Sequence, residues 1–138
     1  MKPKIDPDAF AFRLPFEVRD YECDMEGIVN NAVYQNYLEH TRHVFMRGRG
    51  VDFAALVREG VHLVVTRIEI DYLWPLRAGE SFWVGVSVER MSPVRARFHQ
   101  GILREPDNRP VLKALVTGAS LDARGRPART GVLAKLFD

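Results

Sequence analysis

Hydrophobic and polar residues alternate along several stretches of the chain, and each stretch predicts a β-strand with one buried face. The first stretch covers 12–18, where the apolar positions are Phe12, Leu14, Phe16 and Val18. The same period of two returns after Gly60 and predicts four further strands, over 61–73, 80–91, 94–104 and 111–122. In two of these strands the side chains expected to point inward are Phe82, Val84, Val86 and Val88, and Val94, Ala96, Phe98 and Ile102.

Between the first strand and the other four, the apolar period changes to that of a helix. Asn30 and Asn31 are both good N-cap residues, and Gly48 and Gly50 can end a helix. The predicted helix therefore covers about 16 residues and is about 24 Å long. Its broad apolar face consists of Tyr34, Tyr37, Leu38, Thr41, Val44 and Phe45.

The order of elements indicates one α+β domain. A second, short helix is predicted over 52–59, and tight turns such as Ser92-Pro93 join the later strands, which therefore run antiparallel. One apolar helix and one antiparallel sheet bury their apolar faces when the sheet wraps the helix. We expect a single domain over 1–138 with about five strands around one long helix. Residues 1–10 are expected to form a loose arm, and the tail a short strand or a turn of helix.

Composition and charge narrow the class of protein. Of the 138 residues, 46% are hydrophobic and 28% charged, which is the balance of a soluble globular protein. The net charge of +2 comes from scattered Lys and Arg residues, which argues against nucleic-acid binding. The single cysteine, Cys23, excludes an intrachain disulfide. Neither a membrane-spanning stretch nor a signal peptide is visible, so we expect a cytoplasmic protein with no membrane partner.

The candidate chemistry lies in the segment 21–39. Asp24 is in a loop, Gly27 follows, and the long helix begins a few residues later. The free N–H groups at a helix N-terminus bind a negative oxygen, and a glycine lets the backbone approach closely. A carboxylate beside an oxyanion site is the minimum needed for acyl transfer to water. The residues alone leave open the alternative that Asp24 and Gly27 only shape a turn.

This segment resembles the hotdog-fold acyl-CoA thioesterases of the 4-hydroxybenzoyl-CoA thioesterase superfamily. Their pattern is an Asp, two variable residues, Gly, two apolar residues and an N-capped helix with two Tyr and an acid. The matching residues here are Asp24, Gly27, Ile28-Val29, Asn30-Asn31, Tyr34, Tyr37 and Glu39. The Asn pair is more similar to the long-chain acyl-CoA and acyl carrier protein (ACP) thioesterase branches, in which a His often stands at the position of Ile28. The resemblance in element order covers about 12–122.

The resemblance implies an enzyme that hydrolyses an acyl-CoA or acyl-ACP thioester to a carboxylic acid and a free thiol, without a cofactor. Asp24 would be the nucleophile or the general base, and backbone N–H groups near Asn31 would polarise the carbonyl. Glu39 would orient a water or hold the acyl group, although a surface pair with Arg42 or His43 is an alternative. The residues implied to bind substrate are Tyr34, Val64, Val65, Thr66, Arg90 and Arg95.

Some of these assignments have a structural alternative. Tyr34 and Tyr37 suit packing of the helix core as well as binding. Arg90 and Arg95 flank a turn whose counterpart in relatives often contacts CoA, yet exposed arginines are also common on solvated turns. Because CoA carries phosphates, Arg side chains near a cavity mouth suit it.

Four alternatives find less support. Cys23 beside Asp24 invites a thiol nucleophile, but no motif places a His partner. His40 and His43 can share a helix face, but no third metal ligand is evident for this pair. With Glu39 they do not follow the order of a zinc motif, so we expect no metal site. Two other hotdog functions are a non-catalytic acyl-thioester binder or ligand sensor, and a hydratase whose His/Asp motif is not visible here.

The sequence also predicts an assembly. A single sheet leaves exposed edge strands, and Trp74, Trp83 and many strand valines need cover. By resemblance we expect a homodimer or a dimer of dimers, a homotetramer, with Asp24 of one chain facing Val61–Thr66 of the other. The alternative is a compact monomer with a pocket of its own.

Overall fold

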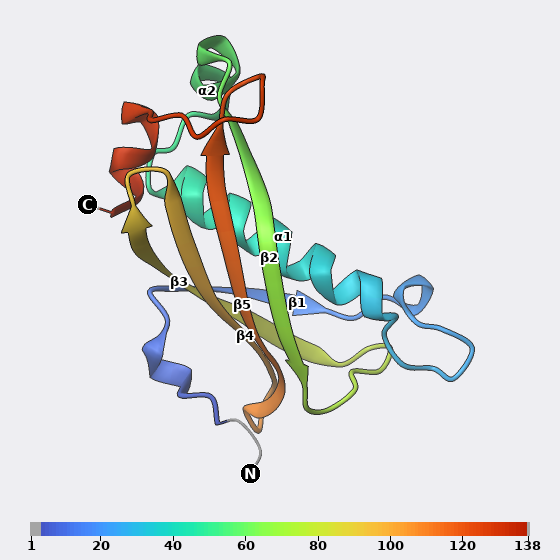
Figure 1. Cartoon of the computed structure of the whole chain (residues 1–138). Coiled ribbons are helices and arrows are strands. Elements are labelled where there is room, and N and C mark those ends of the chain that lie inside the picture. Colours follow the sequence, from blue (N-terminus) through green and yellow to red (C-terminus); the bar gives the residue numbers. More distant parts are fainter. Residues whose placement is uncertain (1–3, 138) are drawn as a thin grey trace.

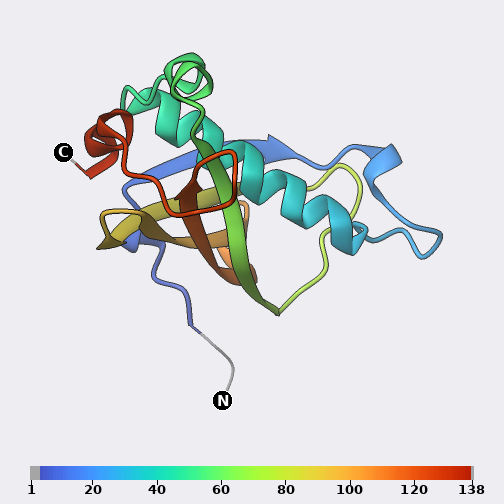
Figure 2. The ribbon, with the colours of Figure 1, turned by 45° about the horizontal axis from the view of Figure 1, so that its top comes forward.

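The computed structural model describes residues 4–137, in which one antiparallel sheet curves around one long helix (Figure 1). Figure 2 shows the helix lying in the concave side of the sheet. The elements in chain order are η1 Pro7–Ala9, β1 Phe12–Glu17, η2 Asp20–Glu22, α1 Asn31–Gly48, α2 Phe53–Glu59, β2 His62–Tyr72, β3 Ser81–Ser92, β4 Arg95–Arg104, β5 Arg109–Leu121 and η3 Gly131–Phe137, where η marks a 3-10 helix. The expected α+β architecture is confirmed.

The five strands form one sheet in the order β1-β3-β4-β5-β2. All neighbouring pairs are antiparallel, and β1 and β2 are the two edges. The pairing of β2 with β5 shifts register between Val65 and Arg67, so Thr66 lies at a bulge. The free edge of β2 runs past the middle of α1 (Figure 1).

The ends of both α-helices follow the predicted capping residues. The Asn30 side chain accepts a hydrogen bond from the Ala32 N–H at 3.0 Å and begins α1, which has 18 residues. The Asp52 side chain accepts from the Ala55 N–H and caps α2, and Gly60 ends it with a φ of 70°. Local hydrogen bonding thus fixes where each helix begins.

The core has two apolar clusters along α1. The first surrounds Leu38 and Phe82 beneath the N-terminal half of the helix, and the second surrounds Phe45, Phe98 and Leu136 beneath its C-terminal half. Both follow the predicted inward faces of the strands, and Phe82, Val84, Val86 and Ile102 are fully buried. About 25 cal/mol is gained per Å² of apolar surface buried, so these clusters provide the main drive for folding.

The expectation of a loose arm over residues 1–10 is wrong for the part of the arm that contacts the sheet, and residues 1–3 lie outside the described chain. The ring of Phe10 covers Gly85 and Gly101, which are paired on β3 and β4. It also meets the Trp83 ring edge to face, with 5.9 Å between centroids. The Ser87 hydroxyl accepts from the Ala11 N–H and donates to the Ala9 carbonyl. Two small residues leave a slot that an aromatic ring fills, so the arm is fixed.

The cover predicted for Trp83 from a second subunit is also wrong. Phe10 packs against this side chain, the Arg13 guanidinium lies 4.0 Å from the ring centroid, and the indole N–H donates to Asn108. Trp83 is therefore buried within its own chain. Trp74 is 39% exposed with Arg109 over its ring, so its cover is incomplete.

The tail forms a helical turn, one of its two expected forms. It is the 3-10 helix η3, which packs against the second cluster through Leu136, a residue that is 2% exposed. No helix over residues 4–137 is long and apolar enough to cross a membrane.

Candidate active site

The loop before α1 holds the Asp24 carboxylate in a tight turn. One oxygen, Oδ1, accepts from the Glu26 N–H at 2.9 Å and from the Ile28 N–H at 3.4 Å. The Gly27 N–H donates to the Asp24 carbonyl at 3.0 Å, and Gly27 has a φ of 80° that favours glycine. Within the described chain Oδ2 makes no hydrogen bond, so this oxygen faces solvent and remains available.

The start of α1 leaves one backbone N–H group available near this carboxylate. The Ala32 N–H is taken by the Asn30 side chain and the Val33 N–H by the Asn30 carbonyl. The Asn31 N–H has no hydrogen-bond partner among residues 4–137. The turn is tied to the helix start because Asp24 N–H donates to the Ile28 carbonyl at 2.9 Å. The turn of Asp24 and Gly27 thus immediately precedes the helix start at Asn31, and a joint catalytic role for the three residues stays a prediction.

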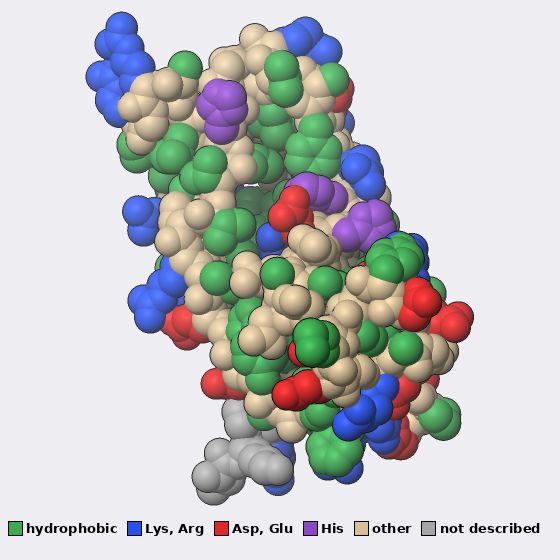
Figure 3. Space-filling model, turned by 90° about the vertical axis from the view of Figure 1, so that its right-hand side faces the viewer, with side chains coloured by type: hydrophobic (Ala, Val, Ile, Leu, Met, Phe, Trp, Pro, Cys, Tyr) green, Lys and Arg blue, Asp and Glu red, His purple; other side chains and the backbone are tan. Residues whose placement is uncertain are grey.

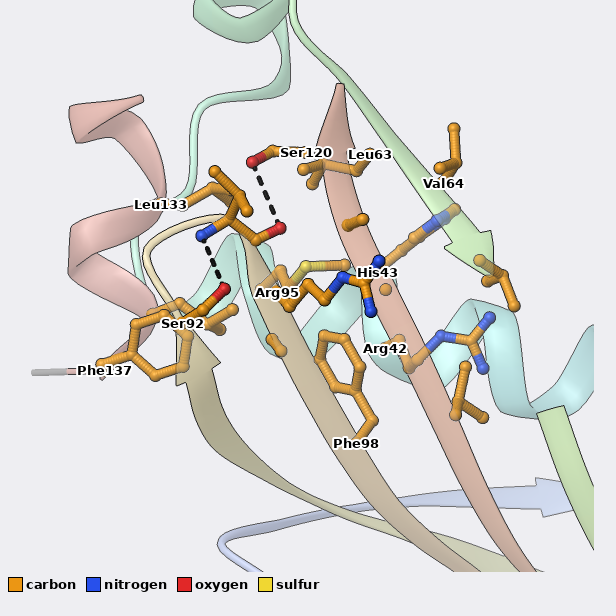
Figure 4. A pocket seen from close by; sticks show the side chains of 18 of the residues that line it. Arg42, His43, Leu63, Val64, Ser92, Arg95, Phe98, Ser120, Leu133 and Phe137 are labelled. Carbon is orange, nitrogen blue, oxygen red and sulfur yellow. Dashed lines mark hydrogen bonds between the residues drawn. The ribbon is translucent and has the colours of Figure 1, made fainter. Parts of the chain in front are cut away.

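A cavity of about 290 Å³ lies at the other half of α1, between the helix and the sheet. It opens beside β2, and Figure 3 shows a hollow on this side of the molecule with hydrophobic, acidic and histidine side chains around it. Figure 4 shows Leu133 and Phe137 at one end of the cavity and Arg42 and Val64 at the other. The residues that line it come from α1, β2, β4, β5 and η3 and from the turn between β3 and β4.

One wall of the cavity carries a buried cation. Arg42 is 6% exposed, and its Nη1 donates to Gln100 Oε1 at 2.9 Å. Gln100 is also buried and donates from Nε2 to the Leu38 carbonyl at 3.1 Å. Burial lowers the pKa of Arg42, and nearby Glu39 opposes this effect. A guanidinium stays charged under these conditions, so the wall presents a positive group to the cavity.

Burial also lowers the pKa of His43, which follows Arg42 in the sequence and also lines the cavity. The neighbouring charge of Glu39 raises that pKa, and the charges of Arg42 and Arg47 lower it further. The His43 ring contacts the Phe53 ring, with 5.7 Å between centroids. His43 therefore favours its neutral form on the cavity wall.

The predicted substrate-binding residues divide into two groups. Glu39, Val64, Val65 and Arg95 line the cavity. Arg90 lies outside its lining, with its guanidinium 5.5 Å from the centroid of Phe137, and the Thr66 hydroxyl is occupied by a bond to the Thr117 carbonyl. No ion pair within 4.0 Å joins Glu39 to Arg42 or His43, so the surface-pair alternative is wrong as a close contact.

The two helix tyrosines belong to the core, as the packing alternative expects. Tyr34 is 4% exposed, and its hydroxyl accepts from the Leu76 N–H at 3.0 Å. The Tyr37 hydroxyl donates to Glu22 Oε1 at 2.8 Å. Burial raises the pKa of both side chains, and the bond to Glu22 raises that of Tyr37 further. Neither lines the cavity; the Tyr37 hydroxyl joins α1 to η2, and the Tyr34 hydroxyl joins α1 to the segment between β2 and β3.

Sequence reasoning missed the buried pair of Arg42 and Gln100 and the contribution of η3. A usable signal was present for Gln100, which occupies an inward position between Phe98 and Ile102 in the alternating pattern of β4. A polar residue at such a position needs a partner, and Arg42 on the helix supplies it. No periodic pattern in the tail indicated that Leu133 and Leu136 would close the cavity.

The arrangement separates reactive groups from apolar space. The loop offers a carboxylate oxygen and a backbone N–H group, while the cavity offers room for an apolar group beside a few polar side chains. In residues 4–137 no group of three or more His, Cys, Asp or Glu residues is placed to hold a metal ion.

Comparison with known proteins gives a consistent picture. Residues 18–136 match the model of the thioesterase-like superfamily. The chain is 41% identical over 116 residues to acyl-acyl carrier protein thioesterase ATL2, chloroplastic, of Arabidopsis thaliana, covering 84% of this chain and 62% of that protein. It likewise spans 60% of the length of ATL3 from the same plant.

Solved structures share the architecture. A thioesterase from Thermus thermophilus, solved with coenzyme A and Zn, matches with a TM-score of 0.78 and 29% identity. The match covers 94% of this chain and 100% of the Thermus chain. Slr0204, a 1,4-dihydroxy-2-naphthoyl-CoA thioesterase from Synechocystis, has a TM-score of 0.84 with 13% identity, covering 91% and 93% of the two chains. The expected hotdog fold is confirmed.

Proposed function

The chain belongs to the thioesterase-like superfamily, and from this premise we propose that it hydrolyses an acyl thioester of coenzyme A or of acyl carrier protein to a carboxylic acid and a free thiol. The observation that carries the proposal is the Asp24 carboxylate, fixed through Oδ1 with Oδ2 left unpaired beside the start of α1. A protein that only bound the thioester would gain little from an ionised carboxylate at this point.

Two routes through Asp24 give the same products. In the first, Oδ2 attacks the carbonyl carbon, the thiolate leaves with a proton from solvent, and water then hydrolyses the mixed anhydride. In the second, Oδ2 takes a proton from a water molecule whose oxygen attacks the carbonyl carbon. In both, the Asn31 N–H donates to the carbonyl oxygen as negative charge develops there.

The site is proposed to be shared between two copies of the chain, as a homodimer or a dimer of dimers. Within one chain Asp24 precedes α1, whereas the cavity lies beyond Glu39, about 12 Å along a helix of this pitch. The edge of β2 is unpaired, and Val65 on it is 52% exposed. A symmetric pair would bring Asp24 of each copy to 61–66 of the other and cover this edge.

Arg90 and Arg95 are proposed to contact the phosphates of CoA. They flank the turn between β3 and β4, and Arg95 lines the cavity whereas Arg90 stacks on Phe137. Guanidinium groups suit phosphate because they donate paired hydrogen bonds.

The purified chain mixed with a panel of acyl-CoA and acyl-ACP substrates and a thiol-detecting reagent tests the proposal. We expect release of free thiol on at least one carrier, and the ratio of rates on the two carriers identifies the preferred one. Binding of acyl-CoA in calorimetry with no thiol release would instead establish the alternative, a non-catalytic acyl-thioester binder.

A further inference from the structure

The cavity has a direction along α1. Its helix lining begins at Glu39 and ends at Met46, a rise of about 10 Å along the helix axis. Val64 of edge strand β2 lies at one end of the lining and Leu133 of η3 at the other (Figure 4). Val65 and Leu136 line the cavity from the same two elements. A ligand entering from the free edge of the sheet would therefore end against η3.

The lining combines polar and apolar parts, and Arg95 of β4 brings a further guanidinium into it (Figure 4). Towards the opening stand the charged and titratable side chains of Glu39, Arg42 and His43. Towards η3, the lining residues Met46, Phe98 and Leu136 belong to one apolar cluster. This combination matches a molecule with a polar head and an apolar tail.

The two serine hydroxyls of this part of the lining already have hydrogen-bond partners, which favours an aliphatic tail. The Ser120 hydroxyl donates to the Ala128 carbonyl at 2.6 Å, and the Ser92 hydroxyl accepts from the Val94 N–H at 3.2 Å. An acyl group with a polar substituent at its far end would leave that substituent without a hydrogen bond here, at a cost of about 1–3 kcal/mol. An alkyl tail carries no such cost.

The helix η3 is anchored as a fixed floor. Leu136 is 2% exposed, Phe137 stacks under Arg90, and the Thr130 hydroxyl just before η3 donates to the Glu59 carboxylate at 3.1 Å. The cavity volume of about 290 Å³ is at the lower end of the roughly 300–1,000 Å³ of ligand cavities. A floor held by these contacts limits the length of the tail.

Building on the proposed function, we propose that the substrate is a medium-length aliphatic acyl thioester whose tail lies in this cavity, and that Leu133 and Leu136 of η3 set its maximum length. The thioester then stays at the opening, at the side where a second copy would bring Asp24. Thus η3 determines specificity and takes no part in the chemistry.

Shortening the floor residues tests the proposal. We expect the wild-type chain to favour octanoyl-CoA over hexadecanoyl-CoA in kcat/KM. Leu133→Ala and Leu136→Ala should each raise the hexadecanoyl-to-octanoyl ratio by about tenfold, because an alkyl group that gains room in an apolar cavity gains about that factor. Leu133 is only partly buried, so its variant keeps the test valid if Leu136→Ala does not fold.

A matched control separates the floor from general loosening of the core. Leu56 of α2 is 3% exposed and belongs to the same apolar cluster as Leu136, yet it does not line the cavity. Leu56→Ala should lower stability and leave the ratio unchanged.

A second variant fills the cavity. A Cβ on Gly118 would lie 3.5 Å from the Val64 carbonyl oxygen and 3.8 Å from the Phe98 ring, so Ala fits without strain. Gly118→Ala should lower kcat/KM for octanoyl-CoA by roughly threefold and leave butanoyl-CoA unaffected, since one added methyl removes room for the tail.

Binding measurements distinguish failure of this proposal from failure of the proposed function. Octyl and hexadecyl thioethers of CoA cannot be hydrolysed, and calorimetry with them reports the cavity whether or not the chain has turnover. If no thioester is hydrolysed, the proposed activity fails, and the ratio of the two dissociation constants still tests the floor. Unchanged ratios in both η3 variants, or an equal shift in Leu56→Ala, would overturn the role of η3.

Discussion

The two halves of α1 present opposite kinds of surface. At its N-terminal end, a solvent-exposed turn holds Asp24 with short-range hydrogen bonds, and every one of those bonds lies within five residues of chain. Along its C-terminal half, residues from α1, β2, β4, β5 and η3 surround an apolar cavity. The reactive group is thus built locally, whereas the space for a ligand is built from distant parts of the chain. Substitutions at the two ends should therefore have different effects.

The largest effect is expected at the loop end. Asp24→Asn keeps the acceptor oxygen for the turn but removes the negative charge, so kcat should fall by at least ~100-fold while the fold is unchanged. Steady-state kinetics and circular dichroism measure the two quantities. Glu26→Gln removes an exposed carboxylate two residues away and serves as the control. A folded Asp24→Asn variant with normal kcat would exclude both routes through this residue.

Separation of the two copies should have the next largest effect. Val65→Glu places charges along the free edge of β2, so light scattering at micromolar concentration should show a shift towards monomer, with turnover lowered by about tenfold. Val57→Glu makes the same change at another exposed valine, on α2, which is 76% exposed. It should alter neither the oligomeric state nor the turnover. A wild-type monomer with full activity would contradict the shared site.

A smaller effect is expected at the turn between β3 and β4. Arg95→Ala and Arg90→Ala should each raise KM for acyl-CoA by several-fold, roughly the loss of one charge-assisted hydrogen bond, and change kcat less. The effect should shrink on a thioester that lacks the nucleotide. Arg109→Ala, at the start of β5, is the control. Equal effects on both substrates would exclude a phosphate contact.

The smallest effect concerns the pH dependence of stability. Burial lowers the pKa of His43 in the folded chain, so the folded state binds fewer protons than the unfolded state. The stability that this difference provides is complete above the unfolded pKa of about 6.5 and is lost as the pH falls through that value. Urea unfolding should therefore show that His43→Gln loses less free energy of unfolding than the wild type between pH 7.5 and pH 5.5, roughly one unit either side of that value. His62→Gln, at an exposed site, should match wild type.

The parts of the molecule that were predictable follow local rules. Strand bounds fell within two residues of their predicted positions because alternation marks a half-buried strand directly, and Asn30, Asp52 and Gly60 mark helix ends through their own hydrogen bonds or backbone geometry. The turn at Asp24 and Gly27 and the helix start at Asn30 were predictable for the same reason, since each needs only local hydrogen bonds.

The parts that were not predictable depend on contacts between distant residues. Phe10 packs on Gly85 and Gly101, 75 or more positions along the chain, and nothing in an arm rich in proline and charge indicates that target. The same holds for Arg42 and Gln100, which meet only after β4 has been placed beneath α1. Long-range packing overrode the local composition in both cases.

The Phe10 ring seated over the paired glycines gives the molecule an optical reporter. Of the two tryptophans, Trp83 lies under that ring at 2% exposure, while Trp74 is 39% exposed. A Trp74→Phe variant would leave Trp83 as the single indole, and its emission would be that of a water-shielded indole while the arm is docked. Replacing Phe10 with Ala should move that emission to longer wavelength, so docking of the arm can be followed in solution without any label.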